Sequence, residues 1–483
     1  MDIAWVASEM APFSKTGGLA DVAGALPKAL AQRGHRVLAI SPRYKPVEGA
    51  VNSGVKFLVR LFGVEHLVEL YVLDRDGVRW VLVDNPCFHR EGIYGDSQGA
   101  YRDNLFRYAL LSRAAIETVR FLHHLDGRPF GDDVVFHAND WHTGLLPVYL
   151  QALYQPRGVL RRASVVLGLH NLGHQGTTAA DAFGGLEIPG HLWSVVDMHG
   201  HINPLKAGIV ASQGLVAVSP TYSRQIQVDQ GFGLEGLLRE RSSDLVGIVN
   251  GIGPEWDPTT DAHLPAHFDR HHLEGKAQCK RSLQADLGLP QRDVPMVSMV
   301  SRLDYQKGID LIQSITPWLL SNDVQLVMLG SGSPEYEAFF RMVERRWPRQ
   351  ARGWVGFSEP LAHRIEAAAD LFLMPSRFEP CGLNQLYSMR YGTVPIVHAT
   401  GGLADTVISA DTGREDATGW SFRSHSVDAF GRAVQSALHT MKRFPKAFAR
   451  IRDNGMRRDS SWNRSAESYE AVYRAVQRMV ARG

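Results

Sequence analysis

The hexapeptide TGGLAD occurs twice in this chain, at residues 16–21 and at residues 400–405. Glycine has no Cβ, so the backbone around Gly18 in the first copy can approach a ligand closely. Lys15 adds a positive charge beside these amides, and the combination suits a phosphate or a developing oxyanion. Asp21 could hold sugar hydroxyls. An ordinary strand-to-helix turn with Asp21 as the helix N-cap is the alternative interpretation.

A second stretch with potential chemistry is SRLDYQKG, residues 301–308. Arg302 and Lys307 follow a predicted strand and enter a loop. Two cations in such a loop could clamp a diphosphate, which the arginine fork can bind in a bidentate manner. The alternative is a pair of solvated surface charges.

The richest stretch reads PSRFEPCGLNQLYSMRYGTVPIV and begins at the end of a predicted strand. Glu379 sits in a turn, where a carboxylate can reach sugar hydroxyls or a developing positive charge. The amides that follow Cys381, those of Gly382, Leu383 and Asn384, would lie at a helix N-terminus and suit a phosphate. No histidine or other base stands beside Cys381, so we interpret its thiol as a packed core group.

Two histidine-containing stretches, HANDWH at 137–142 and HNLGH at 170–174, have spacings that could suggest metal ligands. Neither matches HExxH, and neither is followed by a cluster of carboxylates. We therefore predict no metal site. Both stretches end predicted strands, and we expect a histidine there to hydrogen-bond a sugar or to steady charge near the reaction.

The elements that must position these residues alternate between apolar runs and helical patterns. A strand, a helix and a second strand within about 40 residues form a βαβ unit, which implies parallel pairing. Pro27 lies inside the first helical pattern, so we expect that helix to kink or to start late. The predicted strands are 3–8, 36–41, 134–139, 164–170 and 214–219 in the N-terminal half and 296–302, 324–330, 371–377 and 393–400 in the C-terminal half.

This alternation predicts an α/β protein with two doubly wound, Rossmann-like domains. Ligands of such sheets bind at the carboxyl ends of the strands, so both TGGLAD copies are expected to present a glycine-rich turn to one shared cleft. The predicted parts are an N-terminal domain at 1–248, a hinge at 249–265, a C-terminal domain at 266–462 and a terminal helix at 463–483. That helix has an apolar stripe, which we expect to pack on the N-terminal domain.

The composition bounds the class of protein. Lysine and arginine number 52 against 50 acidic residues among 483, so nothing indicates a nucleic acid or an anionic membrane as partner. Three well-separated cysteines argue against a disulfide framework and favour a reducing compartment. No apolar run approaches the roughly 20 residues that cross a bilayer. We expect a cytoplasmic protein, or one of the plastid stroma if a transit peptide has been removed. The residues leave the oligomeric state open.

Seven motifs occur in a fixed order along the chain: KTGGLADV, DWHTG, HNLGHQG, VNGI, SRLDYQKG, RFEPCGLNQLYSMRYGTVPIV and TGGLADTV. Together they closely resemble the bacterial glycogen synthases and plant starch synthases that use ADP-glucose, and the likeness runs from Ile3 to about Tyr473. The resemblance implies a GT-B fold and transfer of glucose to the non-reducing 4-hydroxyl of an α-1,4-glucan with retention. It also implies that no metal or other cofactor is needed.

The resemblance assigns roles around the donor diphosphate. Lys15, Arg302 and Lys307 look like a clamp on the diphosphate, and Gly18 looks like the glycine that lets the backbone approach it. Thr406, beside the second TGGLAD copy, would lie near the distal phosphate.

Roles around the sugars follow in the same way. Asp21 and His170 look like partners of the transferred glucose, and Asn250 resembles a residue near that sugar. Glu379 and the amides after Cys381 resemble the donor-sugar and phosphate contacts of the C-terminal domain. Asp140 matches a carboxylate on the acceptor side.

The chain departs from the family pattern at two places. The family usually has aspartate where this chain has Gly253, which leaves the hydrogen bonding at the expected hinge open. Related families have a second glutamate seven residues after Glu379, where this chain has Tyr387. The second departure weakens a mechanism that uses two carboxylates.

Two rival functions stay open at the level of sequence. A two-domain dehydrogenase would want GxGxxG with an acidic residue about 20 positions on, and no such pair occurs. A catalytically silent glucan-binding protein would tolerate the loss of Lys15, Asp21 or Glu379, and all three are present. The residues alone do not decide between ADP-glucose and UDP-glucose as donor.

Overall fold

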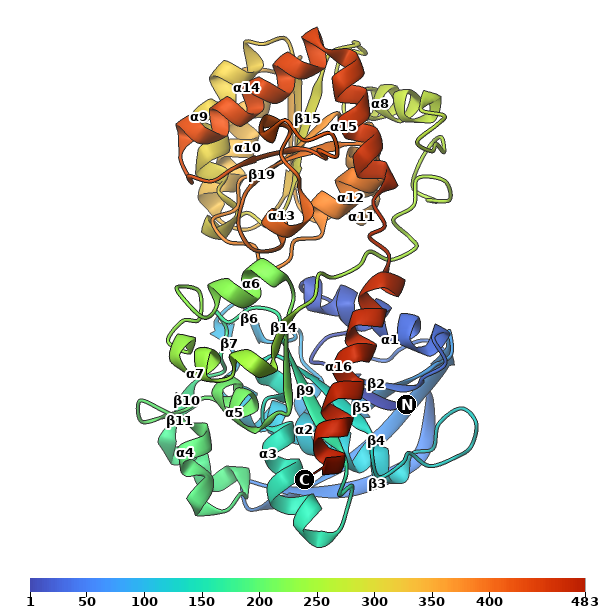
Figure 1. The fold of residues 1–483 in the computed structure, drawn as a ribbon, viewed down its shortest axis with the longest axis vertical. Coiled ribbons are helices and arrows are strands. Elements are labelled where there is room, and N and C mark those ends of the chain that lie inside the picture. Colours follow the sequence, from blue (N-terminus) through green and yellow to red (C-terminus); the bar gives the residue numbers. More distant parts are fainter. Residues whose placement is uncertain (483) are drawn as a thin grey trace. The chain divides into compact units, whose positions relative to one another are not determined.

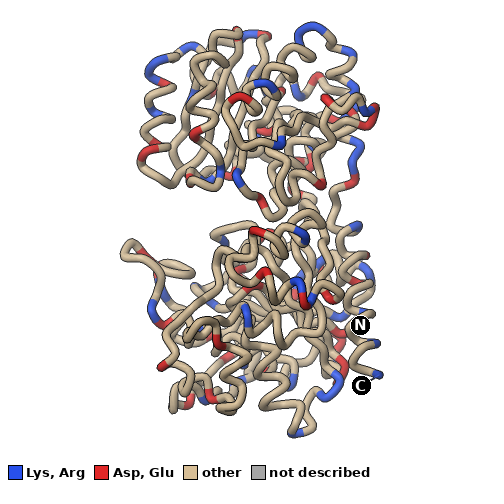
Figure 2. The backbone as a smooth tube through the Cα atoms, turned by 60° about the vertical axis from the view of Figure 1, so that its left-hand side comes forward, with Lys and Arg blue, Asp and Glu red and all other residues tan. Residues whose placement is uncertain are grey.

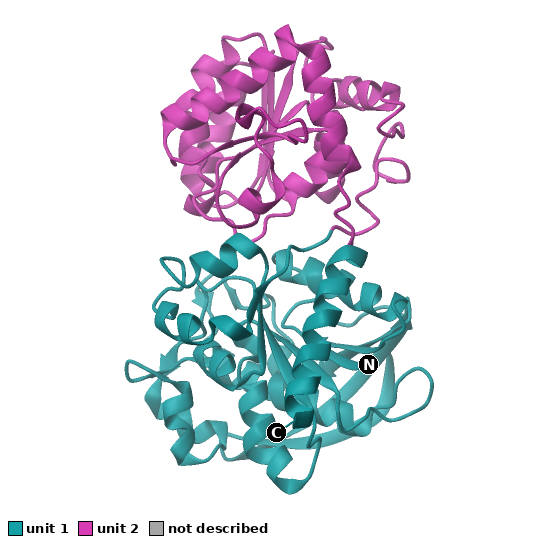
Figure 3. Cartoon of the chain, viewed as in Figure 1, with its two compact units in different colours: residues 1–251, 462–483 teal, residues 252–461 magenta. Residues whose placement is uncertain are grey.

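The structure is a computed structural model that describes residues 1–482, and it divides into two compact units (Figure 3). Unit 1 comprises Met1–Gly251 together with the C-terminal segment from Trp462, and unit 2 is Ile252–Ser461. Lysine, arginine, aspartate and glutamate are intermixed along the chain (Figure 2).

Unit 1 is built on a nine-stranded sheet with the order β14-β13-β9-β8-β1-β2-β5-β4-β3. The strands from β14 to β5 pair in parallel, and the long β3–β4 hairpin adds two antiparallel strands at one edge. The strands are β1 Asp2–Val6, β2 Arg36–Pro42, β3 Val51–Leu61, β4 Val64–Arg75, β5 Val78–Asp84, β8 Val135–Asn139, β9 Ser164–Leu169, β13 Gly214–Ala217 and β14 Leu245–Gly247.

Helices cover both faces of this sheet (Figure 1), which explains why its central strands are apolar throughout instead of alternating. Ile3 and Trp5 of β1 join a core with α1 and α16, while α2 contacts β1 and β2. The helices are α1 Gly18–Gln32, α2 Asn104–Phe121, α3 Leu146–Tyr149, α4 Trp193–Val196, α5 Pro204–Ala211, α6 Pro220–Gln225, α7 Glu235–Glu240 and α16 Trp462–Arg482. Two small antiparallel sheets lie in the connections between these elements. One pairs β6 Gly95–Asp96 with β7 Gly99–Ala100, and the other has the order β10 Thr178–Ala179, β12 His201–Ile202 and β11 Asp197–Met198.

The first helix differs from the expectation of a late start. It begins at Gly18, inside the TGGLAD loop, and continues through Pro27 to Gln32. Its apolar side, which includes Val22, Leu26 and Leu30, is fully buried, and this burial offsets the hydrogen bond that proline cannot donate.

The C-terminal helix α16 returns the chain to unit 1, where it packs beside α1 and β9 (Figure 1). Its stripe of Ala466, Tyr469, Tyr473 and Val476 is at most 3% exposed. Tyr473 also hydrogen-bonds the ring of His137 on β8 through its hydroxyl, with 2.8 Å between Oη and Nδ1.

Unit 2 contains a six-stranded, fully parallel sheet in the order β17-β16-β15-β18-β19-β20. The first strand along the chain lies in the middle, so the order reverses between β15 and β18, the point at which doubly wound sheets bind ligands. The strands are β15 Met296–Val300, β16 Gln325–Gly330, β17 Ala351–Val355, β18 Leu371–Met374, β19 Val394–His398 and β20 Trp420–Phe422.

Helices also flank both faces of this second sheet (Figure 1). One face packs against α9, α10 and α14, and the other packs against α8 and α11. The helices are α8 Glu274–Asp286, α9 Ile309–Leu320, α10 Pro334–Arg346, α11 Glu359–Ala368, α12 Asn384–Arg390, α13 Gly401–Thr406, α14 Val427–Arg443 and α15 Pro445–Arg457.

The segment that we expected as a hinge at 249–265 is divided in the structure, because residues from Ile252 onward belong to unit 2. Asp261 is 4% exposed and its Oδ2 accepts hydrogen bonds from Tyr391 Oη at 2.5 Å and from His363 Nδ1 at 2.7 Å. Trp256 stacks on the rings of both His363 and Tyr387, each at 3.7 Å. These contacts attach the segment to α11 and α12.

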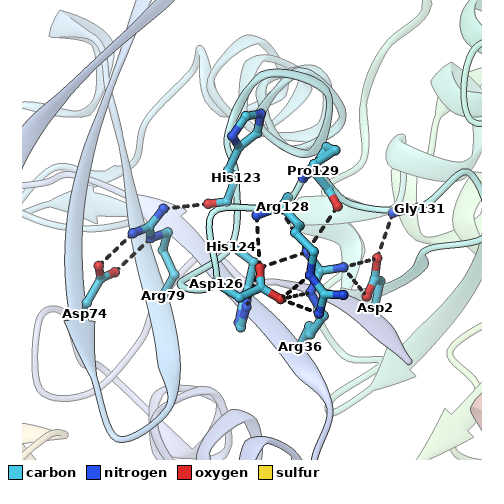
Figure 4. A network of polar contacts seen from close by, with 10 residues as sticks. All are labelled: Asp2, Arg36, Asp74, Arg79, His123, His124, Asp126, Arg128, Pro129 and Gly131. Atoms are coloured by element: carbon cyan, nitrogen blue, oxygen red, sulfur yellow. Dashed lines mark hydrogen bonds and ion pairs between the residues drawn. The ribbon is translucent and has the colours of Figure 1, made fainter.

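A polar network closes the amino ends of β1 and β2 (Figure 4). Arg36, the first residue of β2, pairs with Asp2 of β1 at 3.0 Å, and Asp2 also accepts the backbone N–H of Gly131. Arg36 reaches Asp126 at 3.2 Å, and the hydrogen bonds from Arg128 hold the pKa of Asp126 down at about 2. Since ligands of such sheets bind at the opposite, carboxyl edge, we assign this network to stability.

Candidate active site

The candidate residues of unit 2 follow the carboxyl ends of β15 and β18, which are neighbours in the sheet. The two loops are joined by backbone hydrogen bonds, from Arg377 N to Gln306 O at 2.8 Å and from Gln306 Nε2 to Phe378 O at 3.0 Å. Gly308 has φ +67°, and a Cβ there would collide with the carbonyl oxygen of Pro375. Only glycine allows so close an approach of the two loops.

This junction brings Lys307 and Glu379 together, although 72 residues separate them. Lys307 Nζ donates to Glu379 Oε2 at 2.7 Å, and the Ser376 hydroxyl donates to the same oxygen at 3.0 Å. The two side chains are 16% and 11% exposed, so the pair is mostly sheltered from solvent.

Arg302 stands apart from this pair. Its side chain is 64% exposed, and it lies 3.4 Å from the carboxylate of Asp304. A surface pair of this kind constrains the arginine only weakly. Arg302 is therefore accessible to a ligand at the carboxyl edge of β15.

The backbone after Cys381 turns into α12, which begins at Asn384. Gly382 has φ +72°, a left-handed conformation that favours glycine. The N–H groups of Gly382 and Leu383 donate no hydrogen bond to any other residue among 1–482. The thiol of Cys381 is buried, at 5% exposure, as expected for a packed group.

The second TGGLAD copy has a different role from the first. Gly401 and Gly402 are buried, and a Cβ on them would collide with the carbonyl oxygens of Glu379 and Cys381. Gly402 N donates to Glu379 O at 3.1 Å. These glycines thus pack against the backbone of the turn that contains Glu379 and stabilise it.

Thr406 lies at the C-terminal end of α13 and is 1% exposed. Its hydroxyl donates to Gly402 O at 2.6 Å and accepts from Gln385 Nε2 at 3.1 Å. The side chain therefore ties α13 to α12, and contact with a distal phosphate stays a prediction.

In unit 1 the first TGGLAD copy is organised by Glu9, which the sequence interpretation missed. Glu9 is 3% exposed, and its Oε2 accepts hydrogen bonds from Thr16 N at 2.5 Å, Thr16 Oγ1 at 2.7 Å and Gly17 N at 3.3 Å. Burial raises the pKa of this carboxyl. The position of Glu9, an acidic residue directly after a predicted strand, could have identified it from the sequence.

Lys15 and Asp21 meet at the start of α1, with 2.7 Å between Nζ and Oδ1. Beside them Gly18 is exposed, and a Cβ there would meet no atom within 4 Å. Packing therefore does not require glycine at this position. By contrast, a Cβ on Gly24, six residues further along α1, would lie 2.6 Å from the carbonyl oxygen of Ala11.

Asp140 and His170 follow the neighbouring strands β8 and β9 and are brought together. Asp140 Oδ1 accepts the backbone N–H of His170 at 2.7 Å, and its backbone has φ +54°. Burial raises the pKa of Asp140 to about 7 and lowers the pKa of His170 to about 4. The imidazole is thus neutral at physiological pH.

Aromatic rings line the surroundings of Asp140. Tyr94 lies 4.8 Å from the ring of His142, and its hydroxyl is 2.8 Å from the hydroxyl of Ser8. His142 also packs on Trp141, with 4.1 Å between ring centroids. Tyr94 comes from a loop without periodic pattern, so sequence reasoning had no signal for it.

Asn250 and Gly253 lie at the division between the units. Asn250 is 6% exposed, and its Oδ1 has no hydrogen-bond partner among residues 1–482. A Cβ on Gly253 would collide with the carboxylate of Glu255. This carboxylate occupies the space of the side chain that the family pattern places at residue 253.

Among residues 1–482, no helix has the length and apolar character needed to span a bilayer. No cluster of three or more histidine, cysteine, aspartate or glutamate side chains there has the arrangement of a metal site.

Comparisons with known proteins place this arrangement in a family. Residues 2–240 match the family model described as starch synthase catalytic domain, and residues 284–456 match the one described as glycosyl transferases group 1. Starch synthase 1 of Arabidopsis thaliana is 45% identical over 503 residues, which cover 98% of this chain and 77% of the relative. The chain belongs to the starch and glycogen synthase family. A glycogen synthase of Anaeromyxobacter is 46% identical over 99% of both chains.

Solved structures agree with this assignment. The synthase superposes on the catalytic domain of starch synthase IV from Arabidopsis thaliana, bound to ADP and acarbose, with a TM-score of 0.90, 30% identity and 99% coverage of each chain. A sucrose-phosphate synthase from Thermosynechococcus elongatus shares the fold at 17% identity and a TM-score of 0.61 over 98% of each chain. This synthase is therefore a glycosyltransferase with the GT-B fold, as the motifs predicted.

Proposed function

We propose that this synthase transfers glucose from ADP-glucose to the non-reducing 4-hydroxyl of an α-1,4-glucan with retention of configuration, and so elongates glycogen or starch. The observation that carries the proposal is the likeness over 99% of the chain to a starch synthase whose structure contains ADP and acarbose. The position of the candidate residues at the carboxyl edges of two Rossmann-like sheets supports it.

The donor diphosphate is proposed to bind Arg302 and Lys307 of unit 2 and Lys15 of unit 1. The N–H groups of Gly382 and Leu383, which donate to no residue among 1–482, would add hydrogen bonds to phosphate oxygens. Positive side chains and oriented amides neutralise the leaving diphosphate, so the proposed reaction needs no metal ion.

The nucleotide base is proposed to stack on Phe357, a residue that the sequence interpretation did not select. Phe357 is 81% exposed and lies two residues after the end of β17, at the same carboxyl edge as Arg302 and Lys307. A single exposed aromatic ring is common on protein surfaces, so it is the position of Phe357 at the ligand-binding edge that supports this role. Stacking of an aromatic base would cover this ring.

Retention is proposed to arise on one face of the sugar. The leaving diphosphate, stabilised by the three cations, would accept the proton of the acceptor hydroxyl while the glycosidic bond breaks. Glu379 Oε2 is already shared between Lys307 and Ser376, which supports an orienting role for Glu379 more than attack as a free nucleophile. The main contribution of the protein is then electrostatic preorganisation.

The acceptor is proposed to bind in unit 1, near Asp140 and the rings of Tyr94, Trp141 and His142. Sugar rings stack on aromatic faces while carboxylates accept hydrogen bonds from their hydroxyls.

Within residues 1–482 all three cysteines are free, which supports a reducing compartment such as cytoplasm or plastid stroma.

The proposal is tested by incubating the purified protein with ADP-[14C]glucose and glycogen and measuring both ADP release and label in the polymer. We expect ADP release that depends on glycogen, slower reaction with UDP-glucose, and label that β-amylase releases as maltose. Release of ADP without incorporation, or label that β-amylase cannot release, would contradict the proposed reaction.

A further inference from the structure

Three polar side chains converge beside Gly168 in the interior of unit 1. Gly168 of β9 pairs with Asn139 of β8 in the parallel register. A Cβ on Gly168 would lie 2.8 Å from Asn139 Oδ1, 2.9 Å from His137 Nε2 and 3.1 Å from His170 Nε2. The absence of a side chain at Gly168 is what lets the amide and the two imidazoles meet.

The orientation of the Asn139 amide follows from its neighbours. Asn139 is fully buried, and its Nδ2 donates to the carbonyl oxygens of Val6 at 2.9 Å and of His137 at 3.3 Å. Carbonyl oxygens can only accept, so the NH2 group must face them. Thr143 fixes the backbone of Asn139 as well, by hydrogen bonds to its N–H and its carbonyl.

Asn139 Oδ1 consequently faces His170 Nε2, at 2.8 Å. The amide oxygen can only accept, so Nε2 must carry a proton. A neutral imidazole has a single N–H, and Nδ1 of His170 is then left with a lone pair. His170 is only partly buried, and its Nδ1 has no hydrogen-bond partner among residues 1–482.

We propose that Asn139 is a positioning residue, which holds His170 in the Nε2–H tautomer so that Nδ1 accepts a hydrogen bond from a hydroxyl group of the bound sugar. The tautomer follows from contacts within unit 1 alone. The identity of the ligand as a sugar rests on the proposed function.

The surroundings keep this imidazole uncharged. Burial lowers the pKa of His170 to about 4. His137 and His142 face it from β8 and the turn that follows, and burial holds the pKa of each well below its usual range, so both are uncharged as well. Asp140 Oδ1 accepts a hydrogen bond from the backbone N–H of His170 and not from its ring.

The tautomer is tested directly by 15N NMR of the histidine-labelled wild-type protein between pH 5.5 and 8, with the His170 signals assigned by their absence in His170→Gln. We expect a protonated Nε2 and an unprotonated Nδ1 over the whole range. A protonated Nδ1, an equal mixture of tautomers, or an imidazolium at neutral pH would overturn the proposal, and none of these results depends on catalysis.

A second test uses Asn139→Asp, which replaces the amide oxygen by a carboxylate of the same shape. An opposite charge at hydrogen-bond distance raises a histidine pKa by about 1–3 units. Starting from about 4, the pKa of His170 should then rise to roughly 5–7, and below that pKa both nitrogens are protonated, so Nδ1 can no longer accept. We expect the acid limb of kcat/KM for the donor to move upward by a comparable amount.

The matched control is Asn171→Asp, which adds the same charge one residue from His170. The Asn171 side chain accepts the N–H of Gly173 at 3.0 Å, and within the described residues 1–482 no hydrogen bond joins it to the imidazole. Circular dichroism checks that both variants fold. If the acid limb of kcat/KM then moves equally in both variants, or moves in neither, Asn139 does not act through the His170 ring and the proposal is contradicted. If Asn139→Asp does not fold, the wild-type NMR result decides. If no glucosyl transfer occurs, the proposed function fails while the tautomer result still stands.

Discussion

At the scale of single residues, each cation that we assign to the diphosphate has a carboxylate partner. Lys15 pairs with Asp21 and Lys307 with Glu379, both at 2.7 Å, while Arg302 lies 3.4 Å from Asp304. The Lys307 pair is the most sheltered of the three, so it holds its geometry best. The carboxylates of Asp21 and Glu379 orient the two lysines before a ligand arrives, which is the arrangement that electrostatic preorganisation requires, whereas Asp304 constrains Arg302 only weakly.

Removing either cation of unit 2 should abolish most of the activity. We expect Lys307→Ala and Arg302→Ala to lower kcat by roughly 100-fold or more, because each removes a charge from the leaving diphosphate. Steady-state ADP release measures the effect. Arg341→Ala, which breaks a surface pair with Glu337 on α10, serves as the control. Near-normal turnover in both clamp variants would refute the clamp.

Substitutions at two glycines of α1 distinguish a glycine needed for ligand binding from one needed for packing. Gly18→Ala meets no atom within 4 Å, so we expect unchanged or slightly higher stability but a large loss of kcat/KM for the donor. Gly24→Ala would place a Cβ 2.6 Å from Ala11 O, so we expect a lower melting temperature. Full donor kinetics in Gly18→Ala would show that no ligand approaches there.

At the scale of elements, the C-terminal helix α16 is a structural part of unit 1. Tyr473 reaches across to His137 on β8, whose ring also stacks on Trp5 at 4.0 Å. The helix thereby supports the strand that ends in Asn139 and precedes Asp140. Its apolar stripe could be predicted from the 3.6-residue period, but its hydrogen bond to β8 could not.

Tyr473→Phe removes only the hydroxyl and leaves a buried nitrogen of His137 without its partner. We expect a loss of roughly 1–3 kcal/mol in the free energy of unfolding of unit 1. Urea unfolding monitored by tryptophan fluorescence measures it. Arg474→Ala removes an exposed pair with Glu470 and should cost about 0.5 kcal/mol or less. Equal effects of the two changes would contradict the assigned hydrogen bond.

Helices α11 and α12 of unit 2 meet at a buried carboxyl group. Glu366 is 1% exposed, its Oε2 accepts from Ser388 at 2.7 Å, and burial raises its pKa to about 8. The ordinary value in the unfolded chain is 4.5, so the folded state binds the extra proton between these limits. Stability conferred by the protonated group is therefore lost as pH rises from about 4.5 to about 8.

Glu366→Gln keeps an acceptor for Ser388 without a titratable proton. We expect the stability of the variant relative to wild type to increase from pH 5 to pH 8, as measured by the difference in urea midpoint. A difference that is independent of pH, or that falls over this range, would show that Glu366 is ionised in the folded protein.

At the scale of the whole molecule, the alternation of strands and helices was sufficient to predict two Rossmann-like units. The nine predicted strands all correspond to strands of the two sheets. The β3–β4 hairpin was missed because most residues of β3 are exposed and charged residues such as Lys56, Arg60 and Glu69 interrupt the apolar pattern of the two strands. The pairing of Lys307 with Glu379 could not be predicted from spacing, since it depends on β15 and β18 being neighbours.

The candidate site shows the same limits. Loops that follow predicted strands were located correctly, so Lys15, Asp140 and Glu379 all lie at carboxyl edges. The two TGGLAD copies looked equivalent in sequence, yet Gly18 is exposed whereas Gly402 is buried against Cys381. A glycine that serves a ligand and one that serves packing have the same letter, and only the surrounding backbone distinguishes them.

We propose that residues of both units hold one diphosphate, and a crystal structure of the complex with ADP provides the test. We expect phosphate oxygens within hydrogen-bond distance of Lys15 Nζ and Gly18 N from unit 1 and of Arg302 and Lys307 from unit 2. A diphosphate bound by unit 2 alone, with Lys15 and Gly18 out of reach, would contradict it.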